Sequence, residues 1–153
     1  FDCVTLSPYL GVDSIDPFLL HSGKGVFILC RTSNPSGYEF QDKKIKNEAA
    51  LYESVAMWAN SLNTKENIGL VIGATAPEEL STVRNIAPEL PLLIPGIGAQ
   101  GGDLEHSIRV GNSTGIGIIN VSRSISFAGN LSKSDIQKSA ITYVSKMNEA
   151  LNE

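Results

Sequence analysis

Apolar runs alternate with amphipathic segments along this chain. Five short runs are almost continuously apolar, as in strands of a parallel sheet whose two faces are both covered. The intervening segments repeat apolar residues at helical spacing. We therefore predict five strands, over residues 3–6, 25–31, 68–73, 91–94 and 115–121, each followed by a helix.

Start signals in the sequence support these helices. Asp16 is a candidate cap residue, and Pro17 follows it in the first turn. This pair predicts a helix to about His21. Pro77 with two following acids predicts another helix, and Asp103 predicts a shorter one. A helix is predicted over residues 47–62, with one apolar face made of Leu51, Val55, Trp58 and Leu62. Another is predicted after a capping box at residues 132–135. Its predicted buried stripe comprises Ile136, Ala140, Tyr143, Val144, Met147 and Leu151.

This alternation predicts an α/β fold with a parallel sheet and crossover helices. The links that follow the strands are longer and more polar than those that precede them. Candidate chemistry therefore falls at the carboxyl ends of the strands, as in (β/α)₈ barrels and doubly wound sheets. A complete barrel takes about 250 residues. Residues 1–153 are thus predicted to be one domain, either an open five-stranded sheet or the last five β-α units of a TIM barrel, and the start at a strand without Met favours a portion of a longer protein.

Composition restricts the expected partners and location. The chain has 12 basic and 16 acidic side chains, a net charge of −4, and no long basic cluster, so nucleic acid is not an expected partner. No apolar run approaches the ~20 residues of a membrane span, so no membrane partner is expected. Cys3 and Cys30 lie in strand-like runs and are predicted to be buried thiols in a reducing compartment, which favours a cytoplasmic protein.

Other residues with reactive side chains do not assemble into a catalytic set. No Cys/His cluster has metal-ligand spacing, so no metal site is expected. No Ser/His/Asp set or pair of carboxylates emerges either, and the sequence predicts a binding site rather than a catalytic centre. Ordinary structural positions are predicted for the other candidates. His21 and His106 should be surface or half-buried residues on helices, and Trp58 should be in the core. Lys24 should lie in a helix-to-strand turn, and Lys43, Lys44 and Lys46 should form a solvated run.

The most informative segment is 95–103, Pro-Gly-Ile-Gly-Ala-Gln-Gly-Gly-Asp, where a strand runs into a glycine-rich turn and a helix start. Such a turn exposes backbone N–H groups and is typical of a phosphate site. The spacing Gly96, Gly98, Gly101 also matches a dinucleotide fingerprint, but the next strand lacks the acidic residue that would bind the ribose. A purely structural turn is the remaining alternative.

Polar side chains at two other strand ends extend this site. Arg123 follows the last strand, and the loops after the last two barrel strands often bind phosphate, so Gln100 and Arg123 are candidate phosphate ligands. Residues 32–37, Thr-Ser-Asn-Pro-Ser-Gly, follow the second strand. Their hydroxyl and amide groups suit hydrogen bonding to a base or sugar, but these residues are also common turn formers.

Five segments in this order resemble one family. They are Asp-Cys-Val-Thr-Leu-Ser-Pro-Tyr-Leu-Gly at 2–11, Thr-Ser-Asn-Pro at 32–35, Gly-Leu-Val-Ile-Gly-Ala-Thr-Ala-Pro-Glu-Glu-Leu at 69–80, the glycine-rich segment at 95–103, and Val-Ser-Arg at 121–123. Together they resemble orotidine 5′-monophosphate decarboxylase, in its longer bacterial-type branch, from the fourth barrel strand to the eighth.

The resemblance implies a (β/α)₈ barrel that acts as a homodimer and converts orotidine 5′-phosphate to UMP and CO₂, with no cofactor and no metal. It implies that Gln100 and Arg123 grip the phosphate, helped by backbone N–H groups near Gly101 and Ser122. It further implies that Ser33 forms a hydrogen bond with the edge of the pyrimidine. Pro95 would then form a wall beside the base.

The sequence departs from the family pattern in one important respect. The family's catalytic Asp-x-Lys-x-x-Asp motif is absent and is expected upstream of residue 1, so the isolated chain is predicted to be inactive. Ser7 stands where relatives often have Asn, and it receives no role. Two alternatives remain, another phosphate-binding barrel enzyme such as a sugar-phosphate epimerase or isomerase, and a non-catalytic nucleotide-binding half-barrel.

Overall fold

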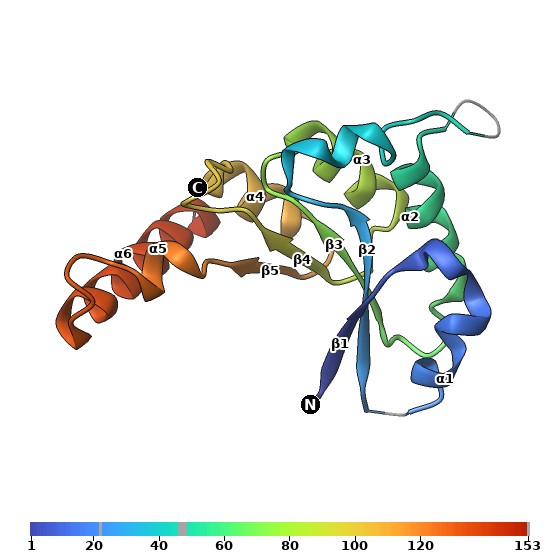
Figure 1. Ribbon diagram of the computed structural model, residues 1–153, viewed down its shortest axis with the longest axis horizontal. Helices are drawn as coiled ribbons and strands as arrows, with labels where there is room; N and C mark the ends of the chain where they lie inside the picture. The colour runs from blue at the N-terminus through green and yellow to red at the C-terminus, as the bar shows by residue number, and fades with distance from the viewer. Residues whose placement is uncertain (22, 46–48, 153) are drawn as a thin grey trace.

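The computed structural model describes residues 1–21, 23–45 and 49–152. Its centre is one parallel sheet with the strands in sequence order, β1-β2-β3-β4-β5. The strand direction turns strongly from β1 to β5, as in a segment of barrel wall (Figure 1). The strands are β1 (Cys3–Leu6), β2 (Gly25–Arg31), β3 (Ile68–Ile72), β4 (Leu92–Pro95) and β5 (Gly117–Asn120). All five predicted strands are present, with ends shifted by one or two residues in β3, β4 and β5.

Helices follow the strands, which confirms the predicted α/β fold class. They are α1 (Asp16–Leu19), α2 (Leu51–Leu62), α3 (Pro77–Ile86), α4 (Leu104–Gly111), α5 (Arg123–Ser126) and α6 (Lys133–Asn152), with 3₁₀ turns η1 (Pro8–Leu10), η2 (Val12–Ser14) and η3 (Pro35–Glu39). Asp103 caps α4 as predicted, accepting from the His106 N–H at 3.0 Å. The Ser132–Asp135 box caps α6, since Asp135 N–H donates to Ser132 Oγ at 3.1 Å.

Two helix starts differ from the prediction. Ile15, not Asp16, is the cap of α1, which ends at Leu19, and no side chain bonds its first turn. Helix α2 begins at Leu51, because the Glu53 carboxylate accepts from the Ala50 N–H at 2.6 Å and closes the turn there. The predicted start at residue 47 lies outside the described residues, as does Lys46.

Burial is uneven across the sheet, which corrects the expectation that both faces of every strand are covered. Strand β3 is buried throughout, whereas alternate residues of β2 are buried and the others are only partly covered. The buried side of β2 packs with α2 in the core, through Val26, Ile28, Val55, Ala56 and Ala59. The edge strands β1 and β5 contain no buried residue, since each has a neighbouring strand on one side only.

The edge position also explains why one cysteine prediction is wrong. Cys30 is buried as expected, at 3% exposure near the carboxyl end of β2. Cys3 is exposed, because it lies in the edge strand β1. Its apolar neighbours predict a strand, but they do not reveal that the strand lies at an edge.

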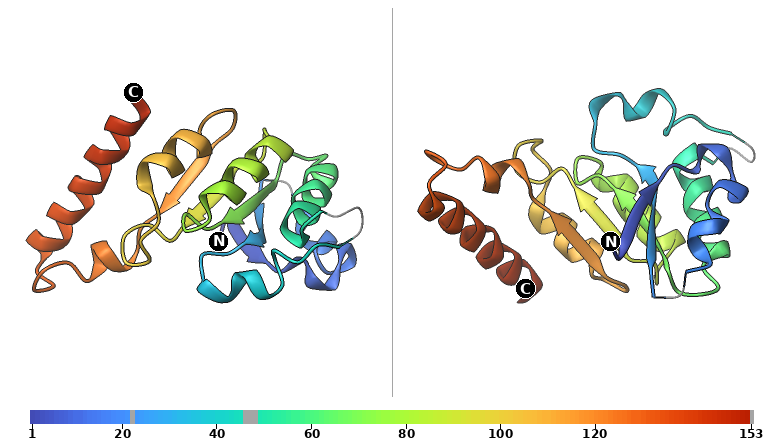
Figure 2. Two further views of the ribbon diagram at one scale, coloured as in Figure 1. Left: turned by 90° about the horizontal axis from the view of Figure 1, so that it is seen from above. Right: turned by 60° about the horizontal axis from the view of Figure 1, so that its bottom comes forward.

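The predicted buried stripe of α6 is only partly buried. Tyr143 packs against the core, but Val144 and Leu151 are 55% and 56% exposed. Helix α6 lies beyond β5, at the far end of the molecule from α1 (Figure 2). It packs against α4 and α5. The apolar spacing of α6 therefore predicts the helix correctly, but the sheet does not extend beneath its whole length, so part of the apolar face is uncovered.

One arginine for which the sequence predicts no role stabilises the amino-terminal end of the sheet. Arg84 on α3 is 2% exposed, and this burial lowers the pKa of its guanidinium. Its Nη1 donates to the carbonyls of Ala87, Pro88 and Leu90 at 3.3, 2.9 and 2.9 Å, and its Nη2 donates to those of Gly111 and Ile116 at 2.6 and 3.3 Å. One side chain thus ties together the links that enter β4 and β5.

Candidate functional site

The carboxyl ends of β4 and β5 are level, which places the chain that follows each strand side by side. Pro95 pairs with Asn120 in the register of these two strands. After Pro95 the chain folds into a tight turn in which the Gly101 and Gly102 N–H groups donate to the carbonyls of Gly98 and Gly96, at 2.9 and 3.0 Å. The turn therefore returns toward the sheet before α4 begins.

Two glycines in this turn are required by the geometry. Gly96 has a φ of 105°, and an added Cβ would lie 3.0 Å from the Ser33 Cβ. Gly98 has a φ of 80°, and an added Cβ would collide with the Ser124 hydroxyl. Side chains at either position would be strained and would push away the neighbouring loops. The glycine-rich pattern thus reflects close approach of three strand-end loops.

A hollow of about 180 Å³ lies between the turn after β4 and the chain after β5. Its lining comprises Pro95, Gly96, Ile97, Ala99, Gln100, Asn120, Ser122 and Arg123. Within the described ranges, the Arg123 guanidinium forms no ion pair. An exposed cation without a carboxylate partner, beside amide and hydroxyl groups, is suited to binding an anion.

Ser33 reaches this site from a different strand. Gln100 Nε2 lies 3.2 Å from Ser33 Oγ and 3.4 Å from the Ser33 carbonyl. Thr75, after β3, donates its hydroxyl to the same carbonyl at 3.1 Å. A second hollow of about 340 Å³, lined by Arg31, Ser33, Asn34, Pro35, Thr75 and Gln100, adjoins the first at Gln100. The loops after β2, β3 and β4 are therefore joined through the Ser33 segment.

The structure brings together five of the six site residues that the sequence singled out. Pro95, Gln100, Ser122 and Arg123 share one hollow, and Ser33 contacts Gln100. Gly101 lies next to Gln100 in the turn but does not line the hollow. Its N–H already donates to the Gly98 carbonyl.

Sequence reasoning missed two features of this region. Asn120 lines the hollow and accepts a hydrogen bond from Ser122 Oγ at 3.1 Å. A polar residue at the end of an apolar strand was the available signal. The other feature is the ion pair between Arg31 and Asp42, with Arg31 Nε 2.7 Å from Asp42 Oδ1, inside the loop after β2. Nothing in the spacing of these residues predicts the pair, because a folded loop brings them together.

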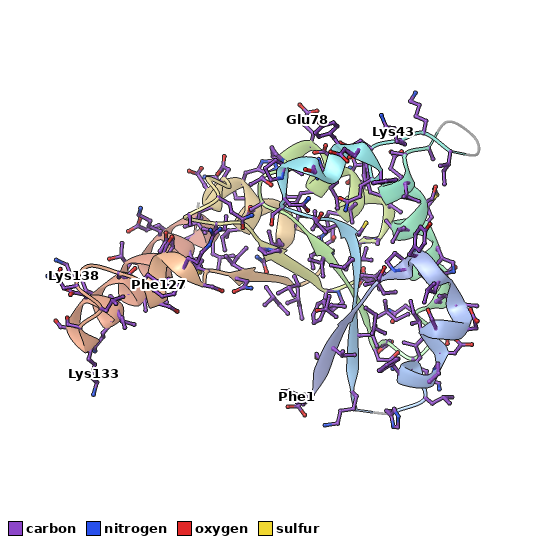
Figure 3. All side chains as sticks on the ribbon, viewed as in Figure 1. Phe1, Lys43, Glu78, Phe127, Lys133 and Lys138 are labelled. Carbon is purple, nitrogen blue, oxygen red and sulfur yellow. The ribbon has the colours of Figure 1, made fainter. Side chains whose placement is uncertain are left out.

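Apart from Lys46, which is not described, the residues predicted to have ordinary structural positions do not line this site. His106 Nε2 is 3.0 Å from the Pro77 carbonyl, a contact in which the imidazole N–H donates. Lys24 pairs with Asp2 at 2.8 Å, at the opposite end of β2. Figure 3 shows Phe1 at that end of the sheet, whereas Lys43 and Glu78 lie at the carboxyl end. Trp58 packs at the edge of the core. His21 is exposed, but it lies beyond the end of α1 at Leu19 rather than on a helix as predicted.

The described residues contain neither a cluster of metal-ligating side chains nor a membrane-spanning helix. No three His, Cys, Asp or Glu side chains within ranges 1–21, 23–45 and 49–152 are placed to hold a metal ion. Over the same ranges, no helix has the length and apolar character needed to cross a membrane. What remains is a parallel β-α protein with a polar hollow at the carboxyl ends of its strands, where barrel enzymes place their ligand sites.

Comparison with known proteins identifies the family. Residues 1–134 match the model described as the orotidine 5′-phosphate decarboxylase / HUMPS family. A curated relative, the orotidine 5′-phosphate decarboxylase of Halorubrum lacusprofundi, is 52% identical over 134 residues, which cover 84% of this chain and 49% of the relative. The chain therefore belongs to the orotidine 5′-phosphate decarboxylase / HUMPS family. It spans about half the length of the curated relatives that it matches.

Solved structures agree with this assignment. The OMP decarboxylase of Leishmania donovani superposes with a TM-score of 0.81 at 35% identity, covering 97% of this chain and 57% of that chain. The UMP synthase of the same organism superposes with a TM-score of 0.84 at 38% identity, covering 97% of this chain and 33% of that chain. The five β-α units are thus part of the (β/α)₈ barrel of this family, as predicted.

Proposed function

We propose that this chain is the substrate-binding portion of an orotidine 5′-phosphate decarboxylase, which converts orotidine 5′-phosphate to UMP and CO₂ without a metal or cofactor. The observation that carries the proposal is that Gln100 and Arg123, from the ends of two adjacent strands, line one hollow. Family membership favours this reaction over sugar-phosphate epimerisation or isomerisation. Neither observation favours a second function.

Each site residue has a role in this proposal. The Gln100 amide and the Arg123 guanidinium hold the phosphate, with the backbone N–H of Ser122. Ser33 bonds the pyrimidine edge, and Pro95 lies against the base. Gly101 contributes through the turn that it permits, because its own N–H is already bonded to Gly98.

The binding groups of this chain assist a reaction that occurs elsewhere on the substrate. Loss of CO₂ leaves negative charge on C6 of the pyrimidine, and a nearby ammonium would stabilise that charge as it develops. The sequence has no Asp-x-Lys-x-x-Asp motif to supply the ammonium. In this proposal the motif belongs to the preceding part of the barrel, with one carboxylate from a partner subunit in a cytoplasmic homodimer. Phosphate contacts remote from C6 supply binding energy that organises the reacting centre.

The proposal is tested by an assay on the full-length protein that carries this sequence. The full-length protein should decarboxylate orotidine 5′-phosphate, and the change in pyrimidine absorbance measures this turnover. Activity should persist when a metal chelator is added. The isolated chain should show no turnover but should bind UMP. Absence of turnover by the full-length protein, or epimerisation of a pentose 5-phosphate instead, would reject the proposal.

A further inference from the structure

The loop after β2, residues 32–42, is folded around a single arginine side chain. Arg31 Nε and Nη2 donate to the two carboxylate oxygens of Asp42 at 2.7 and 3.1 Å. Its Nη1 donates to the Thr32 carbonyl at 2.8 Å. The Arg31 side chain is 11% exposed, and that of Asp42 is 32% exposed. The guanidinium therefore forms the interior of the loop rather than a surface ion pair.

A buried glycine shows how closely the loop packs on this arginine. Gly37 lies in η3, and an added Cβ would collide with Arg31 Nη1. The Gly37 N–H donates to the Asn34 carbonyl at 3.1 Å, and the Gly37 carbonyl accepts from the Gln41 N–H at 2.9 Å. The loop therefore has its own hydrogen-bonded structure, with the guanidinium at its centre.

The two ends of the loop are also tied to each other. The Thr32 N–H donates to Gln41 Oε1 at 2.9 Å, and Gln41 Nε2 donates to Thr32 Oγ1 at 2.9 Å. The Gln41 carbonyl in turn accepts from the Tyr52 N–H at 3.0 Å, in the first turn of α2. Both backbone polar groups of Thr32 are thus held, the N–H by Gln41 and the carbonyl by Arg31.

Fixing Thr32 determines the direction of the next residue, which is Ser33. The Thr32 carbonyl belongs to the peptide unit that joins Thr32 to Ser33, so the Arg31 bond orients that unit directly. Ser33 then meets Gln100, with its Oγ 3.2 Å from Gln100 Nε2. A continuous chain of contacts therefore runs from Asp42 through Arg31 and Thr32 to the candidate site.

We propose that Arg31, held by Asp42, is a positioning residue that sets the Ser33 hydroxyl for recognition of the pyrimidine base. This inference deepens the proposed function and rests on it. Arg31 acts through Thr32 and Ser33, because all three of its side-chain nitrogens donate within the loop. Its effect is therefore larger for ligands that carry a base than for a ligand with only the sugar phosphate, because Arg123 does not depend on Ser33, whereas Gln100 contacts it.

Comparing the binding of two ligands distinguishes a positioning role of Arg31 from a general effect on stability. In the full-length protein, Arg31→Met should weaken UMP binding by tenfold or more. It should weaken ribose 5-phosphate binding clearly less, by about threefold at most, because Arg123 still holds the phosphate. Calorimetry measures both affinities. Asp42→Asn should weaken UMP binding to a smaller extent, because it keeps one hydrogen-bond acceptor. Arg31→Lys should restore part of the UMP affinity, since an ammonium makes fewer of the contacts that a guanidinium makes.

A matched control lies at the other end of the same strand. Lys24 forms an exposed ion pair with Asp2, with side chains 51% and 91% exposed. Lys24, directly before β2, carries the same charge as Arg31, and Lys24→Met should change neither affinity. Hydrogen exchange provides the structural readout, and the Thr32 amide should exchange faster in Arg31→Met than in the Lys24→Met control.

The experimental outcomes distinguish failure of the positioning role from failure of the proposed decarboxylase function. Unchanged UMP affinity in Arg31→Met, or equal losses for UMP and ribose 5-phosphate, would overturn the positioning role alone. Unchanged exchange at Thr32 would do the same. Wild-type protein that turns over no orotidine 5′-phosphate and binds neither UMP nor ribose 5-phosphate would overturn the proposed function, and the inference with it.

Discussion

The Gln100 amide and the Ser33 hydroxyl meet at 3.2 Å, although 67 residues separate them in sequence. Ser33 follows β2 and Gln100 follows β4, so the contact spans the end of the intervening strand β3. Gly73, directly after β3, allows this approach, because an added Cβ would lie 2.5 Å from the Ser33 Cα. The contact links the group proposed to recognise the base with the group proposed to hold the phosphate.

This contact predicts that the two side chains act as a unit. Ser33→Ala and Gln100→Ala should each lower kcat/KM of the full-length protein, and the double variant should lose less than the sum of the two. A net hydrogen bond of about 0.5–1.5 kcal/mol sets the expected coupling. Steady-state kinetics on the four proteins measures it, and strictly additive losses would contradict the link.

Arg123 is the cation of the hollow. Replacing it with Ala removes a charge that is proposed to pair with the substrate phosphate. We expect kcat/KM for orotidine 5′-phosphate to fall at least tenfold, about 1.4 kcal/mol, in the full-length protein. Arg109→Ala is the control, because Arg109 pairs with Glu105 on α4, outside the hollow. An unchanged kcat/KM for Arg123→Ala would remove this residue from the site.

Arg84 should matter for folding rather than for ligand binding. Arg84→Ala would leave buried carbonyls of Leu90 and Gly111 without their donor. We expect the free energy of unfolding to fall by about 3 kcal/mol or more. Arg84→Lys should restore little, since one ammonium cannot reach five acceptors arranged around a planar guanidinium. Urea denaturation measures the change, and Arg109→Ala, an exposed pair, should cost about 0–1 kcal/mol.

The two thiols should differ sharply in reactivity. Burial raises the pKa of Cys30 from 9.0 to about 12. Its reactive thiolate is therefore scarce at pH 8, whereas Cys3 is exposed. Alkylation of the folded chain at pH 8, read by intact mass, should modify Cys3 alone. Modification of Cys30 at the same rate in the folded chain would contradict its burial.

The same shift has a consequence for stability at alkaline pH. The folded state holds the Cys30 proton more tightly than the unfolded state does, because its pKa is raised in the fold. The resulting stabilisation is fully present below pH 9 and is lost progressively as pH rises from there toward 12. Denaturation midpoints measured between pH 8 and 10 should fall less in a Cys30→Ala variant than in the wild-type chain.

Much of the fold was predictable from local patterns. The apolar runs placed all five strands, because short apolar runs bounded by turn residues favour strands, although β1 and β5 contain no buried residue. The starts of α3, α4 and α6 were likewise readable, since caps and first-turn acids act within a few residues of their own position. The glycine-rich segment and the polar residues at strand ends also marked the region where Gln100, Ser122 and Arg123 now lie.

The tertiary structure alone decided which of these residues meet. Edge position exposes Cys3, and the limited extent of the sheet leaves Val144 and Leu151 uncovered on α6. Arg84 and Arg31 have no local signature, because their acceptors come from separate links or from the far end of a folded loop. Local sequence specifies how a segment bends and which side of it is apolar. Pairing of distant segments depends on the packing of the whole chain, since contact energies depend on neighbours that are remote in sequence.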